Sequence, residues 1–329
     1  MSFEERMTEF AGLPVAAFPP GLDGRIRVSG DEAAAVAWRI GNDETWEADP
    51  NVESDFDEIF DYFLTRVDST SVRALVFGLT RREEDEPDLQ EALTALSRHA
   101  DRFPALRALF FGDIVRSESE VSWVGGIPIG RVLEAFPNLE VLGARGDFSV
   151  DRDAEDWRLT AKPDPVAHHN LRSLTMESGG MPSGIIAGVL ASDLPNLEHL
   201  EVYLGSRHYG GNATVEDFAA LLAGDLFPNL RSLGLKDSEI QDDIARALAH
   251  APIVTRLEAL DLSLGVLGDE GAAALLAGQS LAHLKSLDLH HHYLSDAMME
   301  RLRSALPGVD LDLGEQNTDK ARRYIAVAE

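Results

Sequence analysis

Apolar residues recur along the chain in one phrase: apolar, two variable positions, apolar, one variable position, apolar. The phrase occurs as VRALVF, FPALRALFF, FPNLEVLGA, HNLRSLTM, LPNLEHLEV, FPNLRSLGL, TRLEALDL and AHLKSLDL, with its first position between 26 and 34 residues from the next. The last three positions alternate apolar, variable, apolar, which predicts a short strand with one buried face. Eight copies at this spacing indicate an internal repeat.

An amphipathic helix is expected between successive strands. In TVEDFAALLAG, Thr214 can serve as N-cap with Asp217 completing a capping box, and further helices are expected to begin at Asp269 and Ser295. A single strand–helix unit cannot bury its apolar face, whereas stacked units bury these faces against one another. The pattern predicts a right-handed α/β solenoid shaped as a horseshoe, with a parallel sheet on the concave face and helices on the convex face.

The eight phrases resemble the leucine-rich repeats of ribonuclease-inhibitor type, over residues 71–313 and about eight or nine repeats. The chain departs from that pattern three residues after the last core position, where such repeats carry Asn or Cys. These positions hold Gly179, Gly205, Ser238, Gly265 and His292. The segments AVAWRI, SVRALVFG and RRYIAVAE also resemble a bacterial subfamily of leucine-rich-repeat proteins. That resemblance implies genes near biosynthetic enzymes, and it supplies no catalytic residues.

The two ends do not follow the phrase. Residues 1–70 are expected to cap the exposed end of the core, with a strand around Trp38 and an acidic helix over residues 54–67. Residues 314–329 form a polar tail whose RYIAV either docks as a closing strand or remains loose. Two insertions, 112–130 and 146–168, fall on loops, where they either contribute to binding or are tolerated excursions.

Charge narrows the range of partners. The chain has 57 acidic and 29 basic residues, a net charge of −28, which disfavours nucleic acid and anionic membranes. A basic partner fits this charge, and so does a merely solvated acidic surface. The lack of cysteine, of a long apolar run and of a signal-peptide pattern at the amino terminus predicts a cytoplasmic protein.

The resemblance implies that variable strand positions face the concave side. In the amino-terminal repeats these positions are small or apolar, as at Val76 and Phe110, and in the carboxyl-terminal repeats they are acidic. The candidate partner-binding residues are Glu177, Glu201, Tyr203, Lys236, Asp261, Asp288, His290 and Asp312.

Three of these candidates, Asp261, Asp288 and Asp312, are expected on adjacent strands about 4.8 Å apart. Like charges directly opposed are destabilising. The ladder therefore predicts a bound cation, a basic side chain from a partner, or raised pKa values. Screening by water alone is the alternative.

No residues with catalytic spacing were found. The run His290-His291-His292 suggests a metal site, but His290 is expected on the concave face and His292 at the turn position, where a side chain usually satisfies backbone groups, so no metal and no cofactor is predicted. The sequence favours a non-catalytic scaffold that binds a protein or peptide. An accessory subunit of a peptide-modifying biosynthetic system and a divalent-metal-dependent enzyme remain open as alternatives.

Overall fold

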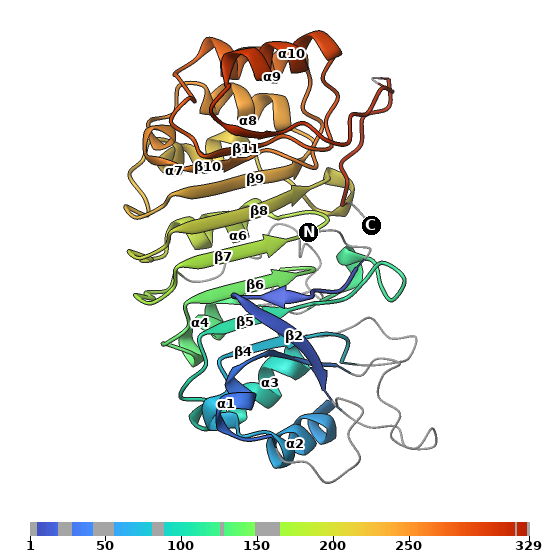
Figure 1. The fold of residues 1–329 in the computed structure, drawn as a ribbon, viewed down its shortest axis with the longest axis vertical. Helices are drawn as coiled ribbons and strands as arrows, with labels where there is room; N and C mark the ends of the chain where they lie inside the picture. Colours follow the sequence, from blue (N-terminus) through green and yellow to red (C-terminus); the bar gives the residue numbers. More distant parts are fainter. Residues whose placement is uncertain are drawn as a thin grey trace. The chain divides into compact units, whose positions relative to one another are not determined.

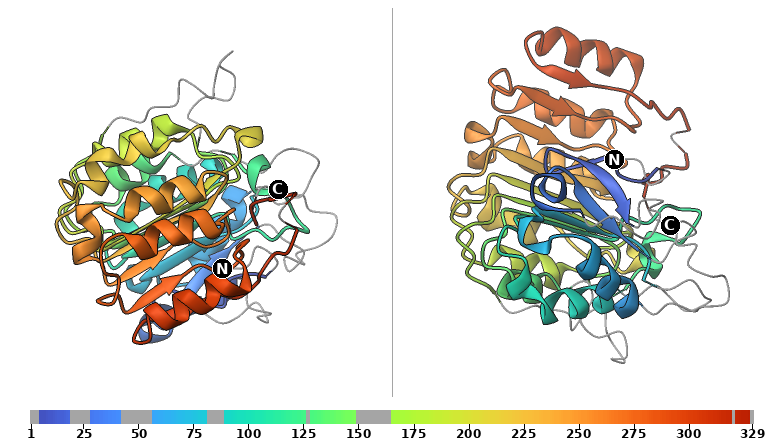
Figure 2. Two further views of the ribbon diagram at one scale, coloured as in Figure 1. Left: turned by 90° about the horizontal axis from the view of Figure 1, so that it is seen from above. Right: turned by 60° about the horizontal axis from the view of Figure 1, so that its bottom comes forward.

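The computed structural model describes residues 5–18, 28–41, 56–80, 89–125, 128–148, 165–319 and 321–327. Contacts divide the chain into two compact units, Met1–Val150 (unit 1) and Asp151–Glu329 (unit 2). In each unit the strands follow one another across a sheet in chain order, with the helices on one side of that sheet (Figure 1, Figure 2). We call the side opposite the helices the inner face.

Unit 1 holds a short antiparallel pair followed by parallel strands. Strand β1 pairs antiparallel with β2, and β2 to β6 are parallel neighbours. The strands are β1 (Glu9–Phe10), β2 (Leu13–Phe18), β3 (Ala37–Ile40), β4 (Ala74–Phe77), β5 (Ala108–Phe111) and β6 (Val141–Arg145). The helices are α1 (Gly30–Ala34), α2 (Phe56–Arg66), α3 (Gln90–Arg98) and α4 (Ile129–Ala135), with 3₁₀ turns at Ser69–Ser71, Ala100–Arg102 and Val121–Trp123.

Unit 2 is a parallel sheet with one helical segment after each of the strands β7 to β11. The strands are β7 (Ser173–Glu177), β8 (His199–Gly205), β9 (Ser232–Ser238), β10 (Ala259–Asp261), β11 (Ser286–Asp288) and β12 (Asp310–Asp312). The helices are α6 (Ser183–Leu190), α7 (Ala219–Leu222), α8 (Gln241–Leu248), α9 (Asp269–Ala277) and α10 (Asp296–Ala305), with 3₁₀ turns at Arg207–Tyr209, Val215–Phe218 and Pro252–Arg256.

Every phrase of the repeat contributes its apolar positions to a core between sheet and helices. Leu200, Leu233, Leu260 and Leu287 occupy equivalent places in β8 to β11 and are at most 1% exposed. In unit 1 the same stacking uses aromatic rings, with Phe77 and Phe111 at 5.0 Å between centroids. The predicted α/β leucine-rich-repeat solenoid with parallel strands is confirmed.

The expected helix starts are also confirmed. Thr214 N donates to Asp217 Oδ2 at 2.7 Å, Ser295 Oγ accepts from Met298 N at 3.2 Å, and α9 begins at Asp269. Thr214 and Ser295 therefore cap the helical segments that follow them and fix where these begin. None of the helices in the described residues is long and apolar enough to cross a membrane.

The sheet of unit 1 extends into residues 1–70. Strand β3 pairs in parallel with β4, with Trp38 opposite Leu75, and α2 follows it as in the later repeats. The expected strand and acidic helix are thus present. They belong to a strand–helix unit in register with the repeats.

The carboxyl-terminal tail runs backwards over the loops that follow the strands of unit 2. Tyr324 N donates to Tyr293 Oη at 2.9 Å, Ala326 N to Leu264 O at 2.8 Å, and Val327 N to Asp237 Oδ1 at 2.9 Å. Tyr293 and Leu264 follow β11 and β10, and Asp237 lies near the end of β9. The tail is neither a closing strand beyond β12 nor loose, because Ile325 and Val327 are buried against the repeats.

Candidate functional site

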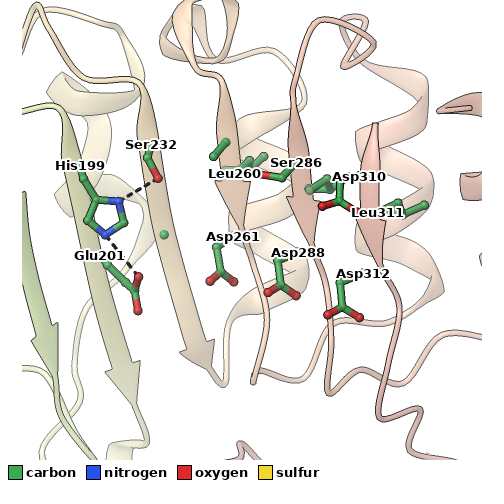
Figure 3. A pocket seen from close by; sticks show the side chains of 13 residues that line it. His199, Glu201, Ser232, Leu260, Asp261, Ser286, Asp288, Asp310, Leu311 and Asp312 are labelled. Atoms are coloured by element: carbon green, nitrogen blue, oxygen red, sulfur yellow. Dashed lines mark hydrogen bonds and ion pairs between the residues drawn. The ribbon is translucent and has the colours of Figure 1, made fainter. Parts of the chain in front are cut away.

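The parallel register of unit 2 aligns the predicted acidic row on its inner face. Asp261 pairs with Asp288 across β10 and β11, and Asp288 pairs with Asp312 across β11 and β12. On the other side Asp261 pairs with Gly234, which pairs with Glu201 of β8. Figure 3 shows the three aspartates side by side and pointing the same way. The predicted placement of the aspartates is confirmed.

A buried lysine lies within this row. Lys236 Nζ is 2.5 Å from Asp261 Oδ2 and 3.6 Å from Glu201 Oε1, and the Lys236 side chain is 5% exposed. The ring of Tyr203 lies beneath the ammonium group, 5.1 Å from Nζ to the ring centroid. The chain itself therefore supplies one cation for the acidic row, where the sequence predicted a cation from outside.

The local charges lower the pKa values of two carboxyl groups in the row. Burial alone would raise the pKa of Glu201, but the hydrogen bond from His199 and the positive charge of Lys236 bring it to about 2. Burial is likewise outweighed at Asp288, whose pKa is lowered by hydrogen bonds from the side chain and backbone of His290. Raised pKa values are one of the outcomes that the sequence predicts for Asp261, Asp288 and Asp312, and this outcome is wrong for Asp288, because His290 donates to its carboxylate.

The pKa of His290 shifts in the opposite direction. Its Nδ1 lies 2.7 Å from Asp288 Oδ1, and this hydrogen bond raises the pKa of His290 although burial opposes the change. Four carboxylates, those of Glu201, Asp261, Asp288 and Asp312, thus face one lysine and one histidine that readily takes up a proton. The row retains a surplus of negative charge.

Three of the predicted contact residues lie below the surface. Glu177, Tyr203 and Lys236 are 4%, 1% and 4% exposed. Lys236 covers the ring of Tyr203, and the loops after β7 and β8 pack so tightly that a Cβ on Gly205 would lie 2.1 Å from Gly179 O. The expectation that these three side chains face a partner is wrong, because the ends of their strands lie under neighbouring side chains and loops.

The accessible part of the site is an open hollow of about 430 Å³ on the inner face of β8 to β12 (Figure 3). It is lined by the carboxylates and by small residues, Ser232, Gly234, Ala259 and Ser286. The small residues leave room above the sheet for an incoming side chain.

His199 is a site residue that the sequence reasoning missed. Its Nδ1 lies 2.8 Å from Ser232 Oγ, and its Nε2 lies 3.4 Å from Glu201 Oε2. The signal was available, because His199 occupies the inner-face position two residues before Glu201.

Among the described residues, one group could hold a metal ion: Asp288, His290 and Asp312, whose ligand atoms lie within 4.8 Å of one another. The three consecutive histidines do not converge there. His292 is fully buried, where its Nδ1 accepts from Leu294 N and its Nε2 lies 3.2 Å from Leu313 O. His292 thus satisfies backbone groups at the turn, as its position in the repeat predicts.

A solved structure from Bacteroides fragilis is similar to this chain over most of its length. The two share 30% sequence identity with a TM-score of 0.72, and the match covers 82% of this chain and 73% of the other. The chain belongs to the same family as this Bacteroides protein. The strand–helix repeats described above are therefore part of a fold that the two proteins share.

Two other solved structures show weaker likeness. An internalin from Listeria monocytogenes is 15% identical with a TM-score of 0.34, covering 75% of this chain and 69% of its own. A leucine-rich-repeat protein from Leptospira interrogans is 12% identical with a TM-score of 0.22, covering 88% and 93%. At these scores the likenesses carry no argument about function. No family model and no curated protein matches the chain.

Proposed function

We propose that this protein is a non-catalytic scaffold in the cytoplasm that binds a protein or peptide through the inner face of unit 2. The observation that carries the proposal is the open hollow lined by Asp261, Asp288 and Asp312. A repeat sheet with an uncovered row of aligned side chains can recognise an extended surface, as solenoid proteins commonly do.

The charge of the hollow supports a basic partner. Lys236 offsets part of the charge of Glu201 and Asp261, and Asp288 is paired with His290. Asp312 has no ion pair among the described residues, where its Oδ1 accepts from Gly314 N. A lysine or arginine side chain from the partner would offset the remaining negative charge at Asp288 and Asp312. Charge-assisted hydrogen bonds would fix the orientation of that side chain.

The test is a peptide-display selection on the immobilised full chain, repeated with the double variant Asp288→Asn and Asp312→Asn. The matched control is Glu270→Gln with Glu300→Gln, which removes two charges from exposed helix positions. We expect peptides rich in Lys and Arg that bind the wild type and the control at least about ten-fold more tightly than the Asp variant. Equal binding to all three proteins would refute the proposal.

Metal analysis separates this proposal from metal-dependent chemistry at the same residues. A divalent ion bound at one equivalent, and lost in the Asp288→Asn and Asp312→Asn variant, would favour a metal centre over a peptide site. We expect no stoichiometric metal, because Asp288 is already engaged by His290.

A further inference from the structure

The inner face of unit 1 is covered by the chain's own amino-terminal segment. Met7 and Phe10 are 6% and 9% exposed and pack into one apolar cluster with inner-face side chains of β3, β4 and β5. Phe10 meets Phe110 edge to face, with 5.9 Å between centroids. The sheet residues of this cluster are Ala37, Ala74, Val76, Ala108 and Phe110. The small and apolar half of the concave face expected from the sequence is therefore present but covered.

Polar contacts fix the other end of the segment. Arg6 Nη2 donates to Glu118 Oε1 at 2.5 Å, and Met7 N donates to Asp113 Oδ1 at 3.1 Å. Asp113 is itself held by Arg39 Nε, which is 2.7 Å from Asp113 Oδ2, and both side chains are buried. The carboxylate of Asp113 thus binds a backbone N–H of the segment, and that of Glu118 binds its basic side chain.

The segment is attached to the sheet through a short hairpin with β2. Its pairing with β2 joins Glu9 with Pro14 and Phe10 with Leu13, and Val15 N donates to Thr8 O at 2.9 Å. The connection turns through Ala11 and Gly12, both exposed and both with positive φ, 51° and 72°. A non-glycine residue in this conformation costs about 1 kcal/mol. A short antiparallel hairpin and the buried side chains of Met7 and Phe10 hold the segment in place.

The groove continues past the turn. A hollow of about 390 Å³ opens beside Ala11 and Leu13, with a floor of Ala74, Ala108 and Val141. Arg73, Arg107 and Glu140 line the same hollow. The surface is therefore longer than the segment that occupies it and could accommodate more of an extended chain.

We propose that the inner face of unit 1 is a binding groove for a linear segment of a partner protein. The segment would carry a basic residue directly before an apolar residue, with a second apolar residue three positions later. Arg6, Met7 and Phe10 show this chemistry in place, and Glu5–Phe10 occupies the groove until a partner displaces it. The proposal is independent of the acidic row in unit 2, because none of its residues lies there.

The test opens the groove by detaching the amino-terminal segment from the folded chain. A protease recognition sequence is inserted between Ala11 and Gly12 in the full chain, the protein is cut, and the released fragment is removed by gel filtration. A labelled peptide with the sequence of residues 5–11, ERMTEFA, is then added. We expect the cut chain to bind it at least about ten-fold more tightly than the uncut chain, because the tethered segment competes at high effective concentration.

Peptide variants test the proposed pattern. The changes Arg6→Glu and Phe10→Ser should each weaken binding about ten-fold or more, whereas Thr8→Ala should not, since Thr8 is exposed. A display selection on the cut chain should enrich the same basic–apolar–x–x–apolar pattern. This binding should survive Asp288→Asn with Asp312→Asn, which distinguishes it from binding at unit 2.

Three results would overturn the proposal. The cut chain could lose cooperative unfolding once the fragment is removed, which would make the segment an integral part of the core. It could stay folded and bind neither the peptide nor any enriched sequence. The uncut chain could form a dimer that exchanges this segment, which would assign the groove to a second copy.

Discussion

Lys236 decides the electrostatics of the acidic row. Its ammonium group lies between Glu201 and Asp261 and above the ring of Tyr203, with only 5% of its side chain exposed. An ammonium group at this depth is stable only with its carboxylates in place, and those carboxylates depend on it in turn. The pKa of Lys236 is accordingly raised, since the two carboxylates outweigh the opposing effect of burial.

The variant Lys236→Met should destabilise unit 2 by about 3 kcal/mol, because Glu201 and Asp261 would lose their buried counter-charge. The free energy of unfolding from urea titration at neutral pH checks this. Lys285→Met is the matched control: Lys285 Nζ is also 2.5 Å from a carboxylate, Glu258 Oε2, but its side chain is 76% exposed. That change should cost less than about 1 kcal/mol, and equal losses would contradict the argument.

Glu201 should make unfolding sensitive to acid. Its folded pKa of about 2 lies below the ordinary value of 4.5, so the stability it contributes is present above pH 4.5 and is lost as the pH falls towards 2. Glu201→Gln should therefore flatten the decline of the unfolding free energy over that interval, measured by urea titration at a series of pH values. An unchanged slope would show that Glu201 is not held in its charged form.

Asp237 should show the opposite pH dependence. It is fully buried, its Oδ2 has no hydrogen-bond partner among the described residues, and burial raises its pKa well above 3.8. A carboxyl group with a raised folded pKa loses stability as the pH rises from its unfolded value through its folded value. Asp237→Asn keeps a residue that tolerates the positive φ of 51°. Its unfolding free energy, relative to wild type, should increase between pH 4 and pH 8, and a constant difference would refute this.

At the scale of elements, the carboxyl-terminal tail ties successive repeats of unit 2 together. It contacts the loops after β11 and β10 and the end of β9 through one hydrogen bond from each of Tyr324, Ala326 and Val327. A solenoid repeat normally contacts only its neighbours. Because the tail spans three repeats, it should couple their local unfolding; we call residues 324–327 the strap.

Tyr293→Phe should loosen this strap. The Tyr293 hydroxyl donates to Tyr324 O at 3.2 Å and accepts from Tyr324 N at 2.9 Å, whereas the ring contacts do not need the hydroxyl. We expect a loss of about 1–2 kcal/mol and faster hydrogen exchange at the amides of Ala326 and Val327. Tyr324→Phe is the control, because its hydroxyl bonds only to exposed Asn317 among the described residues. Faster exchange in both variants, or in neither, would contradict the assignment.

At the scale of the whole molecule, the net charge of −28 dominates. Self-repulsion of this size opposes the compact state and is screened by salt. Raising sodium chloride from about 0.02 M to about 0.5 M should therefore raise the urea midpoint of unfolding while weakening any basic ligand. Choline chloride should act equally; an effect confined to one cation would indicate ion binding instead of screening.

The sequence by itself determined the repeat, the strand register and the acidic row. These depend on local periodicity, and a parallel sheet carries that periodicity from one repeat to the next, so Asp261, Asp288 and Asp312 align as expected. The capping residues Thr214 and Ser295 were predictable for the same reason, since they act within one helical turn.

Only the tertiary structure decided which inner-face residues are accessible. Burial of Tyr203 under Lys236, of Val76 and Phe110 under Met7 and Phe10, and of Asp237 under Val327 depends on contacts between positions far apart in the chain. Residues 5–10 and 321–327, near the two ends of the chain, lack the repeat, so no periodicity indicates where they pack. Whether a side chain is free to meet a partner is set by what covers it, and that covering comes from segments that local pattern cannot place.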